Sequence, residues 1–103
     1  MYTSVYAKIA DNDKLFLGTC VKFLLMLESE DFDSAMTVEV KIEDSSGSIV
    51  QQYESAVYIS DGIYEFLYQS NENGTPGSYE AKIKVVNVSS TTISKIIFNL
   101  NDW

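Results

Sequence analysis

The chain has 103 residues, of which 13% are aromatic, and its seven lysines and fifteen acidic residues give it a net charge of −8. A chain of this length folds as one unit with a core of its own, so we expect a single domain over residues 1–103. The negative charge and the absence of arginine argue against direct binding of nucleic acid, because proteins neutralise phosphates with clusters of lysine and arginine.

Cysteine content and apolar runs limit where the protein folds. Cys20 has no second cysteine to pair with, so we expect no disulfide and a fold that depends on packing. The sequence does not begin with a basic segment followed by an apolar one, so we expect no signal peptide. The longest apolar runs, such as residues 23–27, are too short to cross a membrane. These features favour folding in a reducing compartment without a membrane partner.

The first half of the chain predicts four strands, because apolar and polar residues alternate with the period of two that is typical of half-buried strands. The predicted strands cover residues 5–9, 21–27, 36–43 and 49–53. The breaks between them have loop chemistry. They are the acidic run at residues 11–13, a second acidic loop at residues 28–34, and the Ser-Ser-Gly-Ser turn at residues 45–48.

The second half predicts a short strand at residues 56–59, a central pair of strands and a last strand at residues 95–100. The central pair has the clearest alternation in the chain. Its first strand places Tyr64, Phe66 and Tyr68 on one face, and its second places Tyr79, Ala81, Ile83 and Val85 on one face. Turn signals precede both strands, at residues 61–62 and 75–77.

Seven or eight short strands at regular spacing, without helical periodicity, predict an all-β sandwich or barrel. Two strands are entered through a Gly-x-Tyr step, Gly62-Ile63-Tyr64 and Gly77-Ser78-Tyr79. On these steps the chain resembles the immunoglobulin-like superfamily over nearly its whole length. The resemblance implies an antiparallel β-sandwich, with strands A, B and E in one sheet and C, F and G in the other. Antibody domains are excluded because the cysteine pair and the tryptophan of the third strand are missing, and bacterial, viral and filamin-like variants remain.

The sequence predicts no enzyme, no cofactor and no catalytic or metal site. The chain has no histidine, which excludes Ser-His-Asp and Cys-His arrangements. Cys20 lies within a strand pattern with only Lys22 as a basic neighbour, which is typical of a small packed or semi-exposed hydrophobic residue rather than a nucleophile. Acidic loops raise the alternative of a calcium site, although no spacing matches an EF-hand loop. The carboxylates concerned are Asp11, Asp13, Glu28, Glu30, Asp31 and Asp33.

The two predicted outer faces differ in polarity. The outer face of strands C, F and G carries charged residues: Glu39, Lys41, Glu80, Lys82, Lys84 and Lys95. The outer face of strands A, B and E instead carries large apolar residues, interrupted by Lys8, Lys22 and Glu65. An exposed apolar patch usually marks an interaction site, so we predict a protein interface there. The predicted interface residues are Tyr6, Leu24, Met26, Ile63 and Leu67. The alternative is an internal cover, made by residues 11–17 or by the tail at residues 99–103.

A domain of this size and kind resembles small immunoglobulin-like accessory proteins of tailed bacteriophage virions, such as capsid decoration or cement proteins and neck or tail adaptors. The resemblance implies a non-catalytic structural protein, present in many copies in a virion assembled in the host cytoplasm, with a cytoplasmic protein as the alternative. Its partners would be other structural subunits or copies of itself. Two other functions stay open: a carbohydrate- or ligand-binding sandwich with Tyr53, Tyr58 and Trp103 lining a groove, and a calcium-dependent adhesion module.

Overall fold

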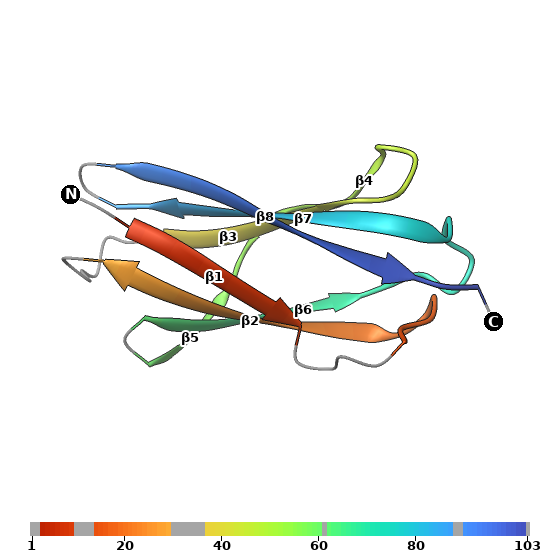
Figure 1. Ribbon diagram of the computed structural model, residues 1–103, viewed down its shortest axis with the longest axis horizontal. Helices are drawn as coiled ribbons and strands as arrows, with labels where there is room; N and C mark the ends of the chain where they lie inside the picture. Colours follow the sequence, from red (N-terminus) through yellow and green to blue (C-terminus); the bar gives the residue numbers. More distant parts are fainter. Residues whose placement is uncertain (1–2, 10–13, 30–36, 61, 88–89, 103) are drawn as a thin grey trace.

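Eight β-strands pack as two layers in the computed structural model (Figure 1), which describes residues 3–9, 14–29, 37–60, 62–87 and 90–102, with the backbone alone for residues 3–6, 8 and 29. The strands are β1 (Thr3–Ile9), β2 (Cys20–Ser29), β3 (Thr37–Glu43), β4 (Ile49–Ser55), β5 (Val57–Ser60), β6 (Ile63–Gln69), β7 (Gly77–Val86) and β8 (Thr91–Leu100). The described segments contain no helix. The prediction of an all-β fold of seven or eight strands is therefore confirmed.

The sheet order is that of an immunoglobulin-like sandwich. The first sheet has the order β1-β2-β6-β5 and the second β4-β3-β7-β8, and the strands of both sheets pair antiparallel. In the usual lettering these are A-B-E-D and C′-C-F-G, so the predicted A-B-E and C-F-G groups are confirmed. The chain crosses from the second sheet to the first at Ala56, whose N–H donates to the carbonyl of Val38 over 2.8 Å.

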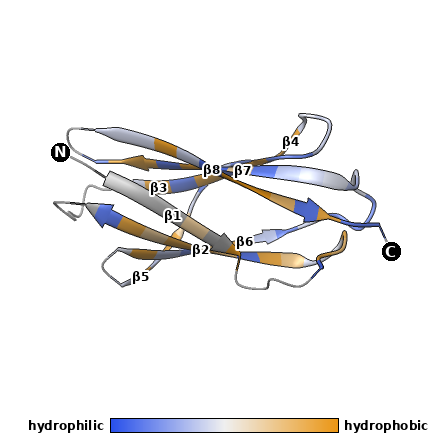
Figure 2. Ribbon diagram, in the orientation of Figure 1, coloured by the Kyte–Doolittle hydropathy of each residue, from blue (hydrophilic) through white to orange (hydrophobic). Residues whose placement is uncertain are grey.

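The alternation of apolar and polar residues decides which side of each strand is buried. In β7 the apolar positions from Tyr79 to Val85 are buried, and the charged positions between them are only half-buried. Figure 2 shows both hydrophobic and hydrophilic residues along the strands, with longer hydrophobic stretches on β2 and β8. Each strand therefore gives one side to the layer between the sheets and the other side to the surface.

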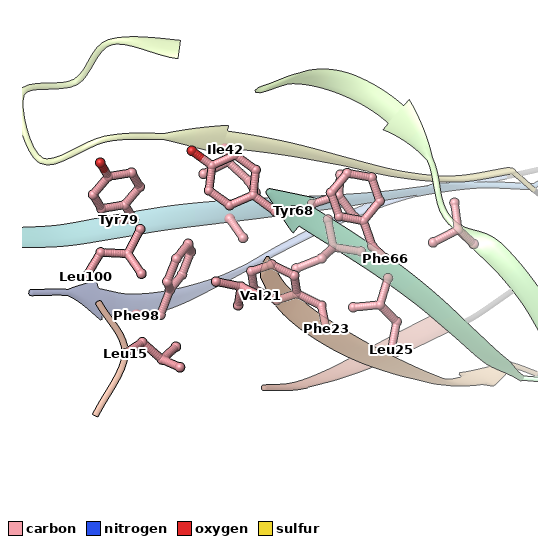
Figure 3. Close-up of a cluster of buried hydrophobic side chains, with 14 of the residues drawn as sticks. Leu15, Val21, Phe23, Leu25, Ile42, Phe66, Tyr68, Tyr79, Phe98 and Leu100 are labelled. Atoms are coloured by element: carbon pink, nitrogen blue, oxygen red, sulfur yellow. The ribbon is translucent and has the colours of Figure 1, made fainter. Parts of the chain in front are cut away.

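Aromatic rings join the two sheets in the core (Figure 3). Phe23 of β2 is fully buried, and its ring meets that of Phe98 of β8 edge-to-face, with 5.3 Å between centroids. Phe98 also lies 5.6 Å from Tyr79, and Phe23 lies 6.5 Å from Phe66. The other buried hydrophobic residues are Leu15, Leu17, Val21, Leu25, Leu27, Val38, Val40, Ile42, Tyr68, Ala81, Ile83, Val85 and Leu100.

The segment before β2 was not predicted to be part of the core. Leu15 and Leu17 are buried there, and Phe16 between them is partly exposed. The segment runs parallel to the end of β8, where Asn101 is bonded through its backbone to both leucines at 2.9 and 3.0 Å. The side-chain amide of Asn101 also donates to the Leu15 carbonyl, at 2.9 Å. The alternating stretch covers only residues 15–17, which is too short to predict a strand from the sequence.

The second Gly-x-Tyr step forms a tyrosine corner at the start of β7. The Tyr79 hydroxyl donates to the carbonyl of Thr75, four residues upstream, over 2.7 Å. Gly77 has a φ of +129°, and a Cβ there would lie 2.9 Å from the Cβ of Ser45. Glycine is therefore required both by backbone conformation and by space. Ala81, fully buried, stands two residues after Tyr79, where antibody domains carry their second cysteine.

Replacing Tyr79 with phenylalanine removes this bond and keeps the ring. We expect the Tyr79→Phe variant to lose about 1 kcal/mol of unfolding free energy, because the hydrogen bond from the Tyr79 hydroxyl to the Thr75 carbonyl is lost. Urea unfolding measures the loss. Thr75→Ala is the matched control, because it keeps the carbonyl that accepts the bond, and it should stay within about 0.5 kcal/mol of the wild type. Equal losses in the two variants would contradict the role of the bond.

Burial also raises the pKa values of Tyr79 and Tyr68 above their ordinary value, with smaller contributions from the Asp44 carboxylate and, for Tyr68, from Tyr79. A raised pKa in the folded state means that the unfolded chain loses these protons first. The contribution of the two protonated hydroxyls to the free energy of unfolding is therefore complete below about pH 10, and it is lost as the pH rises through their pKa values in the folded state. Urea unfolding between pH 8 and 11 should show this decline, and the slope should be shallower for Tyr79→Phe than for the wild type.

Candidate functional site

The outer face of the first sheet carries an apolar surface, called here the apolar face and made of Leu24, Met26, Val57, Ile63 and Leu67. Ladder partners share a side of the sheet, and Met26 lies directly opposite Ile63. Leu24 and Val57 both lie opposite Glu65, from the two neighbouring strands. Val57 and Leu67 are 62% and 56% exposed, and the other three are half-buried. The prediction that Leu24, Met26, Ile63 and Leu67 share the outer face of strands B and E is confirmed.

Tyr6, the fifth predicted interface residue, pairs with Met26 in the β1–β2 ladder. Its register therefore continues the row formed by Met26 and Ile63. Its side chain lies outside the described residues, as does that of Lys8. The backbone alone extends the row of the apolar face to a third strand.

Two charges at the centre of the apolar face neutralise each other, and Glu28 adds a negative charge on the same side at the end of β2. The Nζ of Lys22 lies 3.1 Å from a carboxylate oxygen of Glu65, across neighbouring rows of β2 and β6. Exposed ion pairs of this kind contribute little to stability. The pair nevertheless leaves this part of the surface without net charge, which lowers the cost of covering it with another apolar surface.

The predicted internal cover is not made by the described part of residues 11–17. Leu15 and Leu17 point into the core and pair with Asn101 at the end of β8, in the second sheet. Residues 11–13 and Trp103 lie outside the described residues. Within the described chain, the apolar face therefore stays at the surface.

The outer face of the second sheet, called here the lysine face, carries Glu39, Lys41, Glu43, Glu80, Lys82, Lys84, Ile93, Lys95 and Ile97. The predicted charged residues all lie there, as the registers of β3, β7 and β8 show. Lys41, Lys82 and Lys95 form one row of directly opposed residues across three strands. Like charges in that arrangement repel, so the row costs stability. This row was missed because the sequence does not show the register between strands.

Two kinds of contact offset part of the repulsion. Lys82 lies 3.0 Å from Glu43 and 3.8 Å from Glu80, and the hydrogen bond and charge of Glu43 raise its pKa above the ordinary value. Lys41 and Lys84 lie 5.2 and 5.4 Å from the centre of the Tyr53 ring, within range of cation–π attraction. Lys95 is exposed.

The lysine face is less polar than predicted. β8 begins at Thr91, before the predicted strand, and its register places Ile93 and Ile97 on the outer side. These residues are 62% and 61% exposed. The predicted charged residues therefore share this face with two apolar side chains of β8, which flank Lys95.

The residues proposed for sugar binding do not come together. Tyr53 lies among the lysines of the second sheet, whereas Tyr58 belongs to β5 of the first sheet and packs edge-to-face on Tyr64 at 5.6 Å. Trp103 lies outside the described residues. Tyr53 and Tyr58 therefore do not line one groove.

Most of the proposed calcium ligands are not placed. Asp11, Asp13, Glu30, Asp31 and Asp33 lie outside the described residues, and Glu28 is exposed near the end of β2. The described part of the chain contains no group of three or more His, Cys, Asp or Glu side chains arranged to hold a metal ion. Cys20, the first residue of β2, is exposed rather than packed.

The described surface has two shallow depressions, and in the first of them Asp44 is hydrogen-bonded within its own turn. One, of about 370 Å³, lies beside the β3–β4 turn and is lined by Glu43, Asp44 and Lys82, among others. Asp44 Oδ1 accepts bonds from the Ser46 hydroxyl and backbone and from the Ser48 backbone, and these bonds hold the pKa of Asp44 below its ordinary range. The other depression, of about 460 Å³, is lined by residues 16–19 and Glu72.

One exposed apolar element was missed as a candidate surface. In β5 the three consecutive residues Val57, Tyr58 and Ile59 are each more than half exposed. The signal was present in the sequence as a run of large apolar residues without alternation. It was interpreted only as a short strand.

Comparison with protein families finds no family model that matches the chain, and no curated protein is similar to it in sequence. Nowhere in the described segments is there a helix long and apolar enough to span a bilayer. The structural features that bear on function are therefore the two sheet faces and the β5 edge.

The lysine row gives a test of the electrostatics of the second sheet. We expect Lys95→Glu to raise the urea midpoint at low salt, because it replaces a repulsive pair with Lys82 by an attractive one. Lys95→Gln, which only removes the charge, should fall between the wild type and Lys95→Glu. The differences should shrink at about 1 M salt, where charges are screened beyond roughly 3 Å. A glutamate variant less stable than the glutamine variant at low salt would contradict the row.

Proposed function

We propose that the protein is a non-catalytic structural module that works in multiple copies by protein–protein contact through the apolar face. The single observation that carries the proposal is that large apolar side chains are exposed on that face. Leu67 and Val57 are more than half exposed on a sheet whose other side is packed in the core. Strands that are apolar on both sides are usually covered on both sides.

The neutralised centre of the apolar face favours a protein as partner. The Lys22–Glu65 pair neutralises this centre, and the described charge of Glu28 lies at the border of the face, at the end of β2. Burying apolar surface stabilises a complex by roughly 25 cal/mol per Å² before the costs of association. Repetition of the same contact on an assembly then converts modest affinity into strong avidity.

We further propose that the protein is a multi-copy accessory protein of a virion, of the capsid decoration, cement, neck or tail adaptor kind. The partners would be other structural subunits or copies of the chain, and assembly would take place in the host cytoplasm. The immunoglobulin-like sheet order and the size support this extension by resemblance. Its test is whether the protein is found in purified particles from its natural source.

The apolar face itself is tested with the double variant Leu24→Lys, Leu67→Lys. We expect light scattering to show that the wild type grows beyond a dimer as its concentration is raised, whereas the double variant stays at a dimer or below. The added charges should leave a folded protein because both side chains are on the outer side of their strands. Cooperative thermal unfolding checks that the variant is folded.

The matched control is Ile93→Lys, Ile97→Lys, which puts the same charges on exposed apolar residues of the lysine face. It should associate like the wild type. Two results would contradict the proposal: equal masses for the wild type and the Leu24→Lys, Leu67→Lys variant at every concentration, or loss of cooperative unfolding in that variant, which would make the face internal packing.

A further inference from the structure

The outer edge of the first sheet is β5, a strand whose two sides are both exposed and apolar. Successive residues of a strand point to opposite sides, so an edge strand of a sandwich normally alternates apolar with polar. Val57 and Ile59 are instead 62% and 53% exposed, with Tyr58 at 57% between them. A run of three exposed apolar residues is unfavourable in water unless something covers it.

Charge distinguishes this edge from the others that the structure describes. Lys8, Glu54 and Lys95 lie within β1, β4 and β8, the other strands at the ends of the two sheets, and such charges discourage pairing with another chain. The sequence of β5 is Val-Tyr-Ile-Ser, which contains neither charge nor proline. Register shifts do not separate the edges in the same way, because the ladder of β5 has one, that of β4 has two and those of β1 and β8 have none. Among the edge strands that the structure describes, β5 is therefore the one without the protection of a charged residue.

We propose that β5 pairs antiparallel with β5 of a second copy of this chain, so that two first sheets join into one continuous sheet across a two-fold axis. The proposal rests on the proposed function and names the partner of one contact. A two-fold contact places the same surface on both sides, so the strand must be compatible with itself. An uncharged apolar strand meets that condition, even though each copy carries a net charge of −8.

The register with the two-fold axis at Tyr58 keeps the outer sides of both copies on one side of the joined sheet, because opposed residues share a side. Tyr58 of each copy then lies opposite Tyr58 of the other, and Val57 of each lies opposite Ile59 of the other, so that an aromatic pair is flanked by β-branched pairs. Val57 adds continuity, because it belongs to the apolar face and lies at its β5 border. Edge pairing therefore brings the apolar faces of two copies onto one side of a joined sheet.

The test uses the Leu24→Lys, Leu67→Lys protein as background, because contacts through the apolar face are removed there. We expect light scattering to give a dimer in this background. Adding Ile59→Lys should reduce the mass to that of a monomer, since each lysine would lie opposite Val57 of the other copy and a charge on an edge strand discourages pairing. Adding Ile93→Lys instead is the matched control, because Ile93 is 62% exposed on another edge strand, and the dimer should remain.

Hydrogen exchange supplies a readout specific to strand pairing. In the wild type, the amides of β5 should exchange more slowly as the protein concentration rises, and the dependence should vanish in Ile59→Lys. Ile59→Val keeps the apolar, β-branched character and should retain both the dimer and the protection.

The outcomes separate this inference from the proposed function. A monomer in the Leu24→Lys, Leu67→Lys background, with larger assemblies in the wild type, would overturn the edge pairing and leave the apolar face supported. Dimers of equal mass in the wild type and in that background would do the reverse. A dimer that survives Ile59→Lys, or β5 exchange that is independent of concentration, would also overturn the pairing.

Discussion

The structure depends on side-chain packing between two sheets that no disulfide joins. Phe23 and Phe98 meet edge-to-face from opposite sheets, and Tyr79 and Phe66 extend this aromatic contact toward β7 and β6. Ala81 stands where an antibody domain has its second cysteine, and Cys20 lies exposed at the start of β2. Large rings beside a small buried residue thus supply the close packing of the centre, and the tyrosine corner fixes the turn that leads into β7.

Because packing holds the sheets together, the inner side of each strand is committed to the core, and the described strands can meet a partner through their outer sides and edges. The two outer sides differ in the character of their residues. Four of the seven lysines lie on the lysine face together with three of the fifteen acidic residues, so most of the negative charge lies elsewhere. The apolar face has one ion pair at its centre and large apolar side chains around it.

The β5 edge and the apolar face belong to the same sheet and meet at Val57. β5 extends the first sheet, and Val57 lies in the same row as Leu24 and Glu65. An edge strand joins chains through its backbone, whereas a sheet face joins them through side chains, so the two contacts do not compete for the same groups. A sheet with both properties can form a paired unit and still offer a face to a further subunit. This combination fits a protein that acts in multiple copies.

The sequence by itself determined the fold class, the strands of the core and the side that each presents. A period of two fixes the side of every residue once one side is buried, which is why Leu24, Met26, Ile63 and Leu67 were placed on the outer side. The sequence did not determine the register between strands, because alternation within a strand does not show which residues of two strands lie opposite each other. Only the tertiary structure decided that Lys41, Lys82 and Lys95 form one row, and that Leu15 and Leu17 close the core beside Asn101. It also decided that β5 ends its sheet, because a strand becomes an edge only through the absence of a neighbour, which no local pattern encodes.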